Sequence, residues 1–130
     1  MKRLSILLLS LLVLISFGCK EENATNIKEI TTQEMQSLLK MDQVQLVDVR
    51  TSKEFKTGYI EKAQNIDFLS PTFDQDILKL DKEKPVLLYC HSGGRSAKCA
   101  KKLEEAGFKK IYDLQGGISR WKHEGLAVSK

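Results

Sequence analysis

The stretch that decides the fold reads Val86-Leu87-Leu88-Tyr89-Cys90-His91-Ser92-Gly93-Gly94-Arg95-Ser96. Its first four residues are apolar and predict a buried strand over residues 86–89. The serine and the two glycines after Cys90 break that strand. Residues 95–106 then follow a helical pattern, and Gly107 stands where a helix has its C-terminal glycine cap. The stretch therefore predicts a strand, a tight glycine loop and a helix in direct succession.

The rest of the chain repeats this alternation of short apolar strands and helices. Thr31, with Glu34 three residues later, is a capping-box signature for the start of a helix. The remaining expected elements are strands over residues 44–49, 63–66 and 110–114 and helices over 52–56, 73–80 and 118–123. Such an alternation predicts one α/β domain over residues 27–130, with a mostly parallel sheet covered by helices on both faces.

The first eighteen residues differ from the rest and are typical of a signal peptide. Lys2 and Arg3 form a positively charged start, residues 4–17 are almost wholly apolar, and Gly18 is a small residue at the expected cleavage point. The apolar run is about fourteen residues long, whereas a membrane-spanning helix needs roughly twenty. We therefore expect residues 1–18 to be removed by cleavage before Cys19.

Cys19 indicates a lipid anchor. A cysteine directly after Gly18 is similar to the lipid-modified cysteine of bacterial lipoproteins, although Ser16 and Phe17 depart from the usual residues of that motif. The polar residues 19–26 would form a tether, and the acyl chains would hold the domain at a membrane surface. The prediction is an exported protein, lipid-anchored to the bacterial cell envelope on its periplasmic or outer-membrane side. The alternative is an ordinary signal peptide that happens to precede a cysteine.

Composition excludes several classes of function. The sequence has 130 residues, with 21 Lys and Arg against 17 Asp and Glu; removal of Lys2 and Arg3 leaves 19 against 17, a net charge of +2. No basic cluster is interleaved with aromatic side chains, so no nucleic-acid partner is expected. With Cys19 acylated, Cys90 and Cys99 remain, and they form neither a metal-ligand spacing nor a disulfide framework. We therefore expect no metal site.

The loop after residue 89 has the features of a nucleophile site. In open α/β sheets, ligands bind outside the carboxyl ends of the strands, which is where Cys90 stands. Backbone N–H groups of the glycine loop and the positive end of the following helix would face Cys90 and favour its thiolate, the nucleophilic form. Arg95 adds a guanidinium fork suited to an oxyanion such as a thiosulfonate or a phosphate. A buried structural cysteine beside an ordinary loop is the plainer alternative.

Several motifs in order resemble the family of single-domain rhodaneses, which are sulfurtransferases. Residues 90–96 are similar to the family's active-site loop. Further blocks that resemble conserved family blocks over nearly the whole domain are Leu46-Val47-Asp48-Val49-Arg50 with Glu54-Phe55 and Gly58-Tyr59-Ile60, then Ala63-Gln64-Asn65-Ile66, then Gly116-Gly117-Ile118 with Trp121. Tyr59 and Lys62 replace a histidine and a glycine that are frequent in the family. The resemblance implies a rhodanese-like fold with a five-stranded sheet.

The resemblance also implies covalent sulfur transfer through Cys90. The thiolate would attack the outer sulfur of a donor such as thiosulfate, hold that sulfur as a persulfide and pass it to cyanide or a thiol. Loop N–H groups would cradle the sulfur or the anionic part of the donor, and Arg95 would orient the donor. The expected substrate-binding residues are Arg95, His91, Ser92, Gly93, Gly94 and Ser96. We expect a monomer that needs no metal and no organic cofactor.

Two neighbouring features have a structural interpretation. Asp48 and Arg50 lie two residues apart at the end of a strand, so they share one face at the same sheet edge as Cys90. We interpret Arg50 as paired with Asp48 or Glu54 to hold the loop, with a direct role at the site as the alternative. Cys99 is interpreted as a small buried hydrophobic residue, with a resolving role towards Cys90 as the alternative.

Two other functions are open at this point. A phosphatase or arsenate reductase also places a cysteine and an arginine around an oxyanion loop, but four residues separate Cys90 from Arg95. The related cell-cycle phosphatases have five, and the shorter loop favours a single sulfur atom over a phosphate-sized centre. The other function is a non-turnover sulfur carrier or binding module of the cell envelope. Retention of Cys90 and Arg95 argues against simple loss of catalysis, but it is also compatible with a carrier fed by a partner protein.

Overall fold

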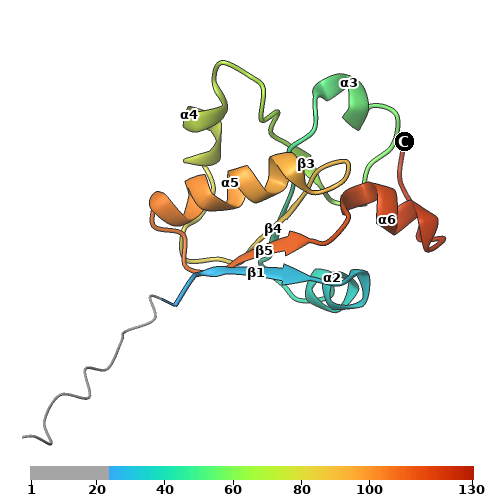
Figure 1. Ribbon diagram of the computed structural model, residues 1–130, viewed down its shortest axis with the longest axis horizontal. Coiled ribbons are helices and arrows are strands. Elements are labelled where there is room, and N and C mark those ends of the chain that lie inside the picture. Colours follow the sequence, from blue (N-terminus) through green and yellow to red (C-terminus); the bar gives the residue numbers. More distant parts are fainter. Residues whose placement is uncertain (1–23) are drawn as a thin grey trace, which may run out of the picture.

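The computed structural model describes residues 24–130 (Figure 1). The predicted signal peptide, its cleavage before Cys19 and the lipidation of Cys19 lie outside the described residues. Within residues 24–130, none of the helices has the length and apolar character needed to cross a membrane.

A five-stranded sheet forms the centre of the domain, which confirms the predicted fold class. Its strands are β1 (Ile27–Ile30), β2 (Gln45–Asp48), β3 (Gln64–Asn65), β4 (Val86–Tyr89) and β5 (Ile111–Leu114). Their order is β1-β5-β4-β2-β3, and every neighbouring pair is parallel. Because the strands are parallel, their carboxyl ends meet at one edge of the sheet, and β4 ends there between β2 and β5.

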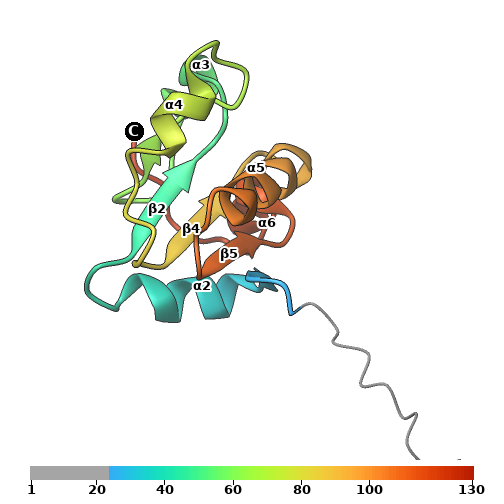
Figure 2. The same cartoon turned by 90° about the vertical axis from the view of Figure 1, so that its left-hand side faces the viewer.

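Helices cover both faces of this sheet. They are α2 (Thr32–Leu39), α3 (Ser52–Phe55), α4 (Phe73–Ile77), α5 (Gly94–Glu105) and α6 (Gly117–His123). Helices α4 and α5 lie on one face and α2 on the other (Figure 1, Figure 2). Helix α6 packs through Ile118 and Trp121 into the same apolar cluster as Met35 of α2. Covering both faces explains why the central strands are apolar throughout rather than alternating.

Strand β4 is completely buried. All four of its residues, Val86 to Tyr89, have 0 % of their surface exposed. Burial of a large aliphatic or aromatic side chain contributes roughly 1.5–3 kcal/mol, so this strand is fixed from both faces. The Tyr89 hydroxyl oxygen also accepts a hydrogen bond from the Ile60 N–H at 3.0 Å. The residue that follows β4 therefore has a rigid support.

Two matched capping boxes begin the helices α2 and α3. In the first, Thr31 N–H donates to Glu34 at 2.9 Å, and the Glu34 N–H donates back to the threonine hydroxyl. In the second, Thr51 and Glu54 exchange the same two bonds at 3.0 and 3.2 Å. Each box satisfies N–H groups that a helix start leaves without partners. The short α3 depends on its box because it buries no residue.

Candidate active site

Cys90 is the residue immediately after β4, and 1 % of its surface is exposed. The chain turns sharply here, since Gly93 has φ +120°, a value that side chains rarely permit. This turn brings the Gly93 N–H to 3.0 Å from the Cys90 Sγ. Helix α5 begins at the next residue, so its first turn also faces the thiol. The sulfur atom thus sits in a cradle of backbone donors.

The surroundings of Cys90 favour its thiolate. Burial by itself raises the pKa of the Cys90 thiol, but hydrogen bonds from the Ser96 side chain and from the backbone N–H groups of Ser96, Gly93 and Ser92 lower it. The net result is a pKa below the ordinary value for a cysteine. Hydrogen bonds to the charged form are the general reason for such a shift. The geometry therefore gives a partly preformed nucleophile.

The start of α6 holds the loop from the other side. The Ile118 N–H donates to the Cys90 carbonyl oxygen at 2.9 Å, and the Ser119 N–H donates to the His91 carbonyl oxygen at 3.0 Å. Gly117, with φ +57°, makes this approach possible, because an added Cβ would lie 2.5 Å from both carbonyl oxygens. Gly117 belongs to the Gly116-Gly117-Ile118 block that resembles the family, but no spacing in the sequence indicates this contact.

Arg95 is bound to a glutamate of α3. Its two terminal guanidinium nitrogens donate to the two carboxylate oxygens of Glu54 at 2.7 and 2.9 Å. Arg95 holds the pKa of the Glu54 carboxyl well below its usual range. Their side chains are 25 % and 36 % exposed, so the pair lies at the rim of the site. Glu54 belongs to a block that resembles the family, but its position in the sequence does not indicate a contact with the loop.

Asp48 and Arg50 form a second, fully buried pair beside the loop. The Arg50 Nε lies 3.0 Å from both Asp48 oxygens, and one terminal nitrogen lies 2.6 Å from Oδ2. The same terminal nitrogen donates to the Gly58 carbonyl oxygen at 2.7 Å. Burial lowers the pKa of Arg50, but Asp48 more than offsets this, and the net pKa is raised. Arg50 therefore ties β2 to the segment after α3.

The predicted loop residues differ in how far they face solvent. Ser96 is fully buried, and its hydroxyl oxygen lies 3.2 Å from the Gly93 carbonyl oxygen. Gly93 and Arg95 are half-buried, whereas the remaining three loop residues are exposed: His91, Ser92 and Gly94. The structure thus brings the loop, α3 and the end of β2 together around Cys90.

Two buried groups lie deeper, under α5. Cys99 has 0 % of its surface exposed, and burial, assisted by the nearby Asp113 charge, raises the pKa of its thiol to about 12. Asp113 of β5 is 4 % exposed, and its Oδ1 is the one buried side-chain oxygen or nitrogen without a hydrogen-bond partner within residues 24–130. Burial, with a further contribution from Glu29, raises the pKa of Asp113 to about 6, although a hydrogen bond with Ser96 opposes the shift.

Asp113 should make the protein less stable as pH rises. Its pKa is about 6 in the folded chain against 3.8 for the free group. Between these values the unfolded chain loses the proton first, so the free energy of unfolding falls until pH exceeds about 6. Asp113→Asn cannot ionise. We expect its stability advantage over the native protein, measured by urea unfolding, to be about 2 kcal/mol larger near pH 7.5 than near pH 4.

Asp42→Asn is the matched control for this measurement. It makes the same change at an exposed position. We expect its effect on stability to vary by less than about 0.5 kcal/mol over the same pH range. An advantage of Asp113→Asn that stays constant with pH would contradict the expectation.

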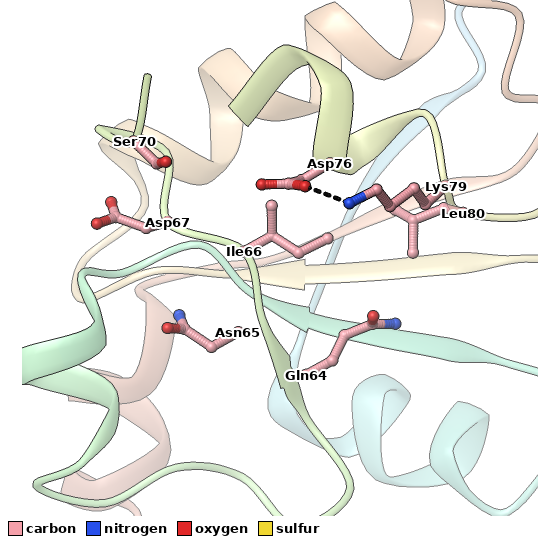
Figure 3. A pocket seen from close by; sticks show the side chains of 8 residues that line it. All are labelled: Gln64, Asn65, Ile66, Asp67, Ser70, Asp76, Lys79 and Leu80. Carbon is pink, nitrogen blue, oxygen red and sulfur yellow. Dashed lines mark hydrogen bonds and ion pairs between the residues drawn. The ribbon is translucent and has the colours of Figure 1, made fainter. Parts of the chain in front are cut away.

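A separate hollow of about 400 Å³ lies along β3 and α4 (Figure 3). The side chains that line it are Gln64, Asn65, Ile66, Asp67, Ser70, Asp76, Lys79 and Leu80. Within it Asp76 and Lys79 form an ion pair at 2.7 Å, and the Asn65 amide donates to the Arg50 carbonyl oxygen at 2.8 Å. Cys90 does not line this hollow, so the candidate site is the loop. No group of three or more potential metal ligands occurs in the described part of the chain.

Comparison with known proteins agrees with this geometry. Residues 31–124 match the model of the family described as the rhodanese-like domain. The chain belongs to the rhodanese-like family. It is 36 % identical over 95 residues to a protein named thiosulfate sulfurtransferase GlpE from Coxiella burnetii, covering 73 % of this chain and 87 % of that one.

Two solved structures extend the comparison. A rhodanese-like domain protein from Staphylococcus aureus superposes with a TM-score of 0.67 at 36 % identity, over 79 % of this chain and 99 % of that one. A polysulfide-sulfur transferase homodimer from Wolinella succinogenes gives a TM-score of 0.68 at 30 % identity, over 80 % and 79 % of the two chains. The rhodanese-like domain of this protein therefore corresponds to nearly the whole of the first structure.

Proposed function

We propose that this rhodanese-like protein is a sulfurtransferase that carries a sulfane sulfur as a persulfide on Cys90. The main support is the position of the Cys90 thiol at the end of β4. The Gly93 nitrogen lies 3.0 Å from Sγ, and the pKa of the thiol is lowered. Relatives named thiosulfate sulfurtransferase support a donor such as thiosulfate. The acceptor in this proposal is cyanide or a thiol.

The first step loads Cys90. The thiolate attacks the outer sulfur of thiosulfate, a bond forms between Sγ and that sulfur, and the sulfur–sulfur bond of the donor breaks. Sulfite leaves with the electron pair, so the total charge is unchanged and no proton is needed. The loop N–H groups stabilise the persulfide anion in the same way as they stabilise the thiolate, because they converge on one point.

The second step regenerates Cys90. A nucleophile such as cyanide attacks the outer sulfur of the persulfide, and Sγ leaves as the thiolate. A low thiol pKa helps here as well, because a more stable thiolate is a better leaving group. The division of one transfer into two displacements is covalent catalysis, and every step uses groups of the loop.

Intact-mass measurement tests this proposal. The purified protein is incubated with thiosulfate and weighed, then treated with cyanide and weighed again. We expect a gain of one sulfur atom, located on the peptide that contains Cys90, and its loss with formation of thiocyanate. A protein with reduced Cys90 that gains no sulfur from thiosulfate would favour the alternative of a carrier loaded only by a partner's persulfide.

We also propose that the domain is exported and held at the bacterial cell envelope by a lipid on Cys19. The support is the sequence pattern of residues 1–19, namely a charged start, an apolar run and Gly18 before the cysteine. Mass spectrometry of the mature N-terminal peptide tests it. We expect an acylated Cys19 as the first residue, and an unmodified residue at that position would contradict the anchor.

A further inference from the structure

The two arginines beside Cys90 are already bound to carboxylates. Arg95 gives both terminal nitrogens to Glu54, at 2.7 and 2.9 Å, in a fork-to-fork arrangement. Arg50 is buried and bound to Asp48. Arg95 is the one lysine or arginine among residues 90–96 of the loop. Neither of these two arginines therefore offers a free guanidinium fork to an anion at Cys90.

We propose that Glu54 determines which sulfur donor the Cys90 site accepts, by holding Arg95 away from the donor. This inference rests on the proposed persulfide chemistry. The favoured donor is a persulfide of an organic thiol, in which the sulfane sulfur is attached to a second sulfur with no further anionic group. Thiosulfate remains a donor but a poorer one, because its sulfonate end would be bound better by a free cation.

The charges of the two donors explain this preference. Thiosulfate is a dianion, and its reaction with Cys90 releases sulfite, also a dianion, while Cys90 carries a negative charge throughout. A guanidinium fork is the natural partner of such an oxyanion. Glu54 occupies that fork and adds a negative charge at the rim of the site. Thiosulfate must therefore displace Glu54 or bind beside it.

An organic persulfide has neither requirement. The Cys90 thiolate attacks its outer sulfur, the sulfur–sulfur bond of the donor breaks, and the organic thiolate leaves with the electron pair. The outer sulfur keeps its proton, so a single negative charge passes from Cys90 to the leaving thiolate. The backbone donors of the loop act on sulfur alone, and they are available with the Glu54–Arg95 pair in place.

Glu54→Gln separates the two donors. Glutamine can still accept the Thr51 N–H, so the capping box of α3 is kept. The neutral amide releases Arg95 from its bidentate pair. A partly exposed pair of this kind is weak enough to predict a modest effect: we expect KM for thiosulfate to fall about fivefold. With the persulfide of 2-mercaptoethanol as donor, whose organic part carries no charge, we expect kcat/KM to stay within about twofold of the native value.

The chain offers a matched control and a test of whether Glu54 acts through Arg95. Glu34→Gln makes the same change in the same type of Thr-initiated capping box, on α2. We expect it to leave the ratio of the two donors' kcat/KM values unchanged. In an Arg95→Met background, Glu54→Gln should lose most of its fivefold gain, because no guanidinium remains to be released.

Each outcome decides the inference. A donor ratio that Glu54→Gln leaves unchanged, in a variant with the native melting temperature, overturns it. A full gain in the Arg95→Met background also overturns it, because the carboxylate charge alone would then be responsible. If neither donor loads Cys90 in the native protein, the proposed function itself fails. This result differs from one in which both donors load Cys90 and Glu54→Gln does not change their ratio.

Discussion

We expect Cys90→Ser to abolish sulfur transfer, with a fall in turnover of at least about 10³-fold. A serine hydroxyl ionises far less readily than a thiol and forms no persulfide. The loop donors around residue 90 remain, since Gly93 and Ser96 are unchanged, but they no longer act on a nucleophile. Intact mass after incubation with a sulfur donor, together with the rate of thiocyanate formation, measures the effect.

Cys99→Ser is the matched control for this substitution. Cys99 is fully buried, and its thiol pKa is raised to about 12, so it is poorly suited to attack a donor. We expect Cys99→Ser to be loaded with one sulfur atom to the native extent. Sulfur bound to Cys90→Ser, or a loss of loading in Cys99→Ser, would contradict the assignment of Cys90 as the acceptor of the sulfur.

Four of the strands were predicted from the sequence. Strands β2, β4 and β5 each carry a local apolar run, whereas the two residues of β3, Gln64 and Asn65, are polar. Strand β1 was not predicted as a strand. Its residues, Ile27-Lys28-Glu29-Ile30, include two charged side chains and lie at the edge of the sheet. Its strand conformation comes from parallel pairing with β5, more than eighty residues away in the chain. Pairing at that separation leaves no local pattern that a single sequence reveals.

Helix α4 shows a different kind of discrepancy. Helical periodicity predicted residues 73–80, but the helix ends at Ile77. Leu80 is nevertheless buried in the same cluster as Phe73 and Ile77. The apolar spacing therefore predicted correctly that these three side chains enter the core. The backbone nevertheless leaves the helix after Ile77 to reach β4. Element boundaries are generally the least secure part of such a prediction.

The site was predictable where its residues are consecutive and not where its contacts are remote. Cys90 and the loop could be inferred because the strand, the glycines and the helix follow one another. The Glu54–Arg95 pair joins residues 41 positions apart, and the contacts of α6 with the loop, from Ile118 to Cys90 and from Ser119 to His91, join residues 28 positions apart. Spacing in the chain carries no information about such partners. The burial of Asp113 was also not predicted, because one acidic residue in an apolar strand gives no sign of where its oxygens point.

The second large effect concerns stability: we expect Arg50→Met to lower the free energy of unfolding by about 3–5 kcal/mol. Asp48 is 0 % exposed and Arg50 2 %. Without the guanidinium, the Asp48 carboxylate keeps a hydrogen bond from the backbone N–H of residue 50 at 2.9 Å but loses its countercharge. The Gly58 carbonyl oxygen also loses its donor. Small domains have only about 5–15 kcal/mol in total, so urea or thermal unfolding will show the change clearly.

Two further variants distinguish a buried uncompensated charge from a general loss of an ion pair. Lys79→Met removes the cation of an exposed pair with Asp76, and we expect it to cost less than about 1 kcal/mol. Asp48→Leu combined with Arg50→Met removes both buried charges, and we expect much of the stability to return. A double variant as unstable as Arg50→Met alone would contradict this reasoning. Recovery of stability without recovery of sulfur transfer would show that the pair serves the site by fixing the end of β2 beside the Cys90 loop.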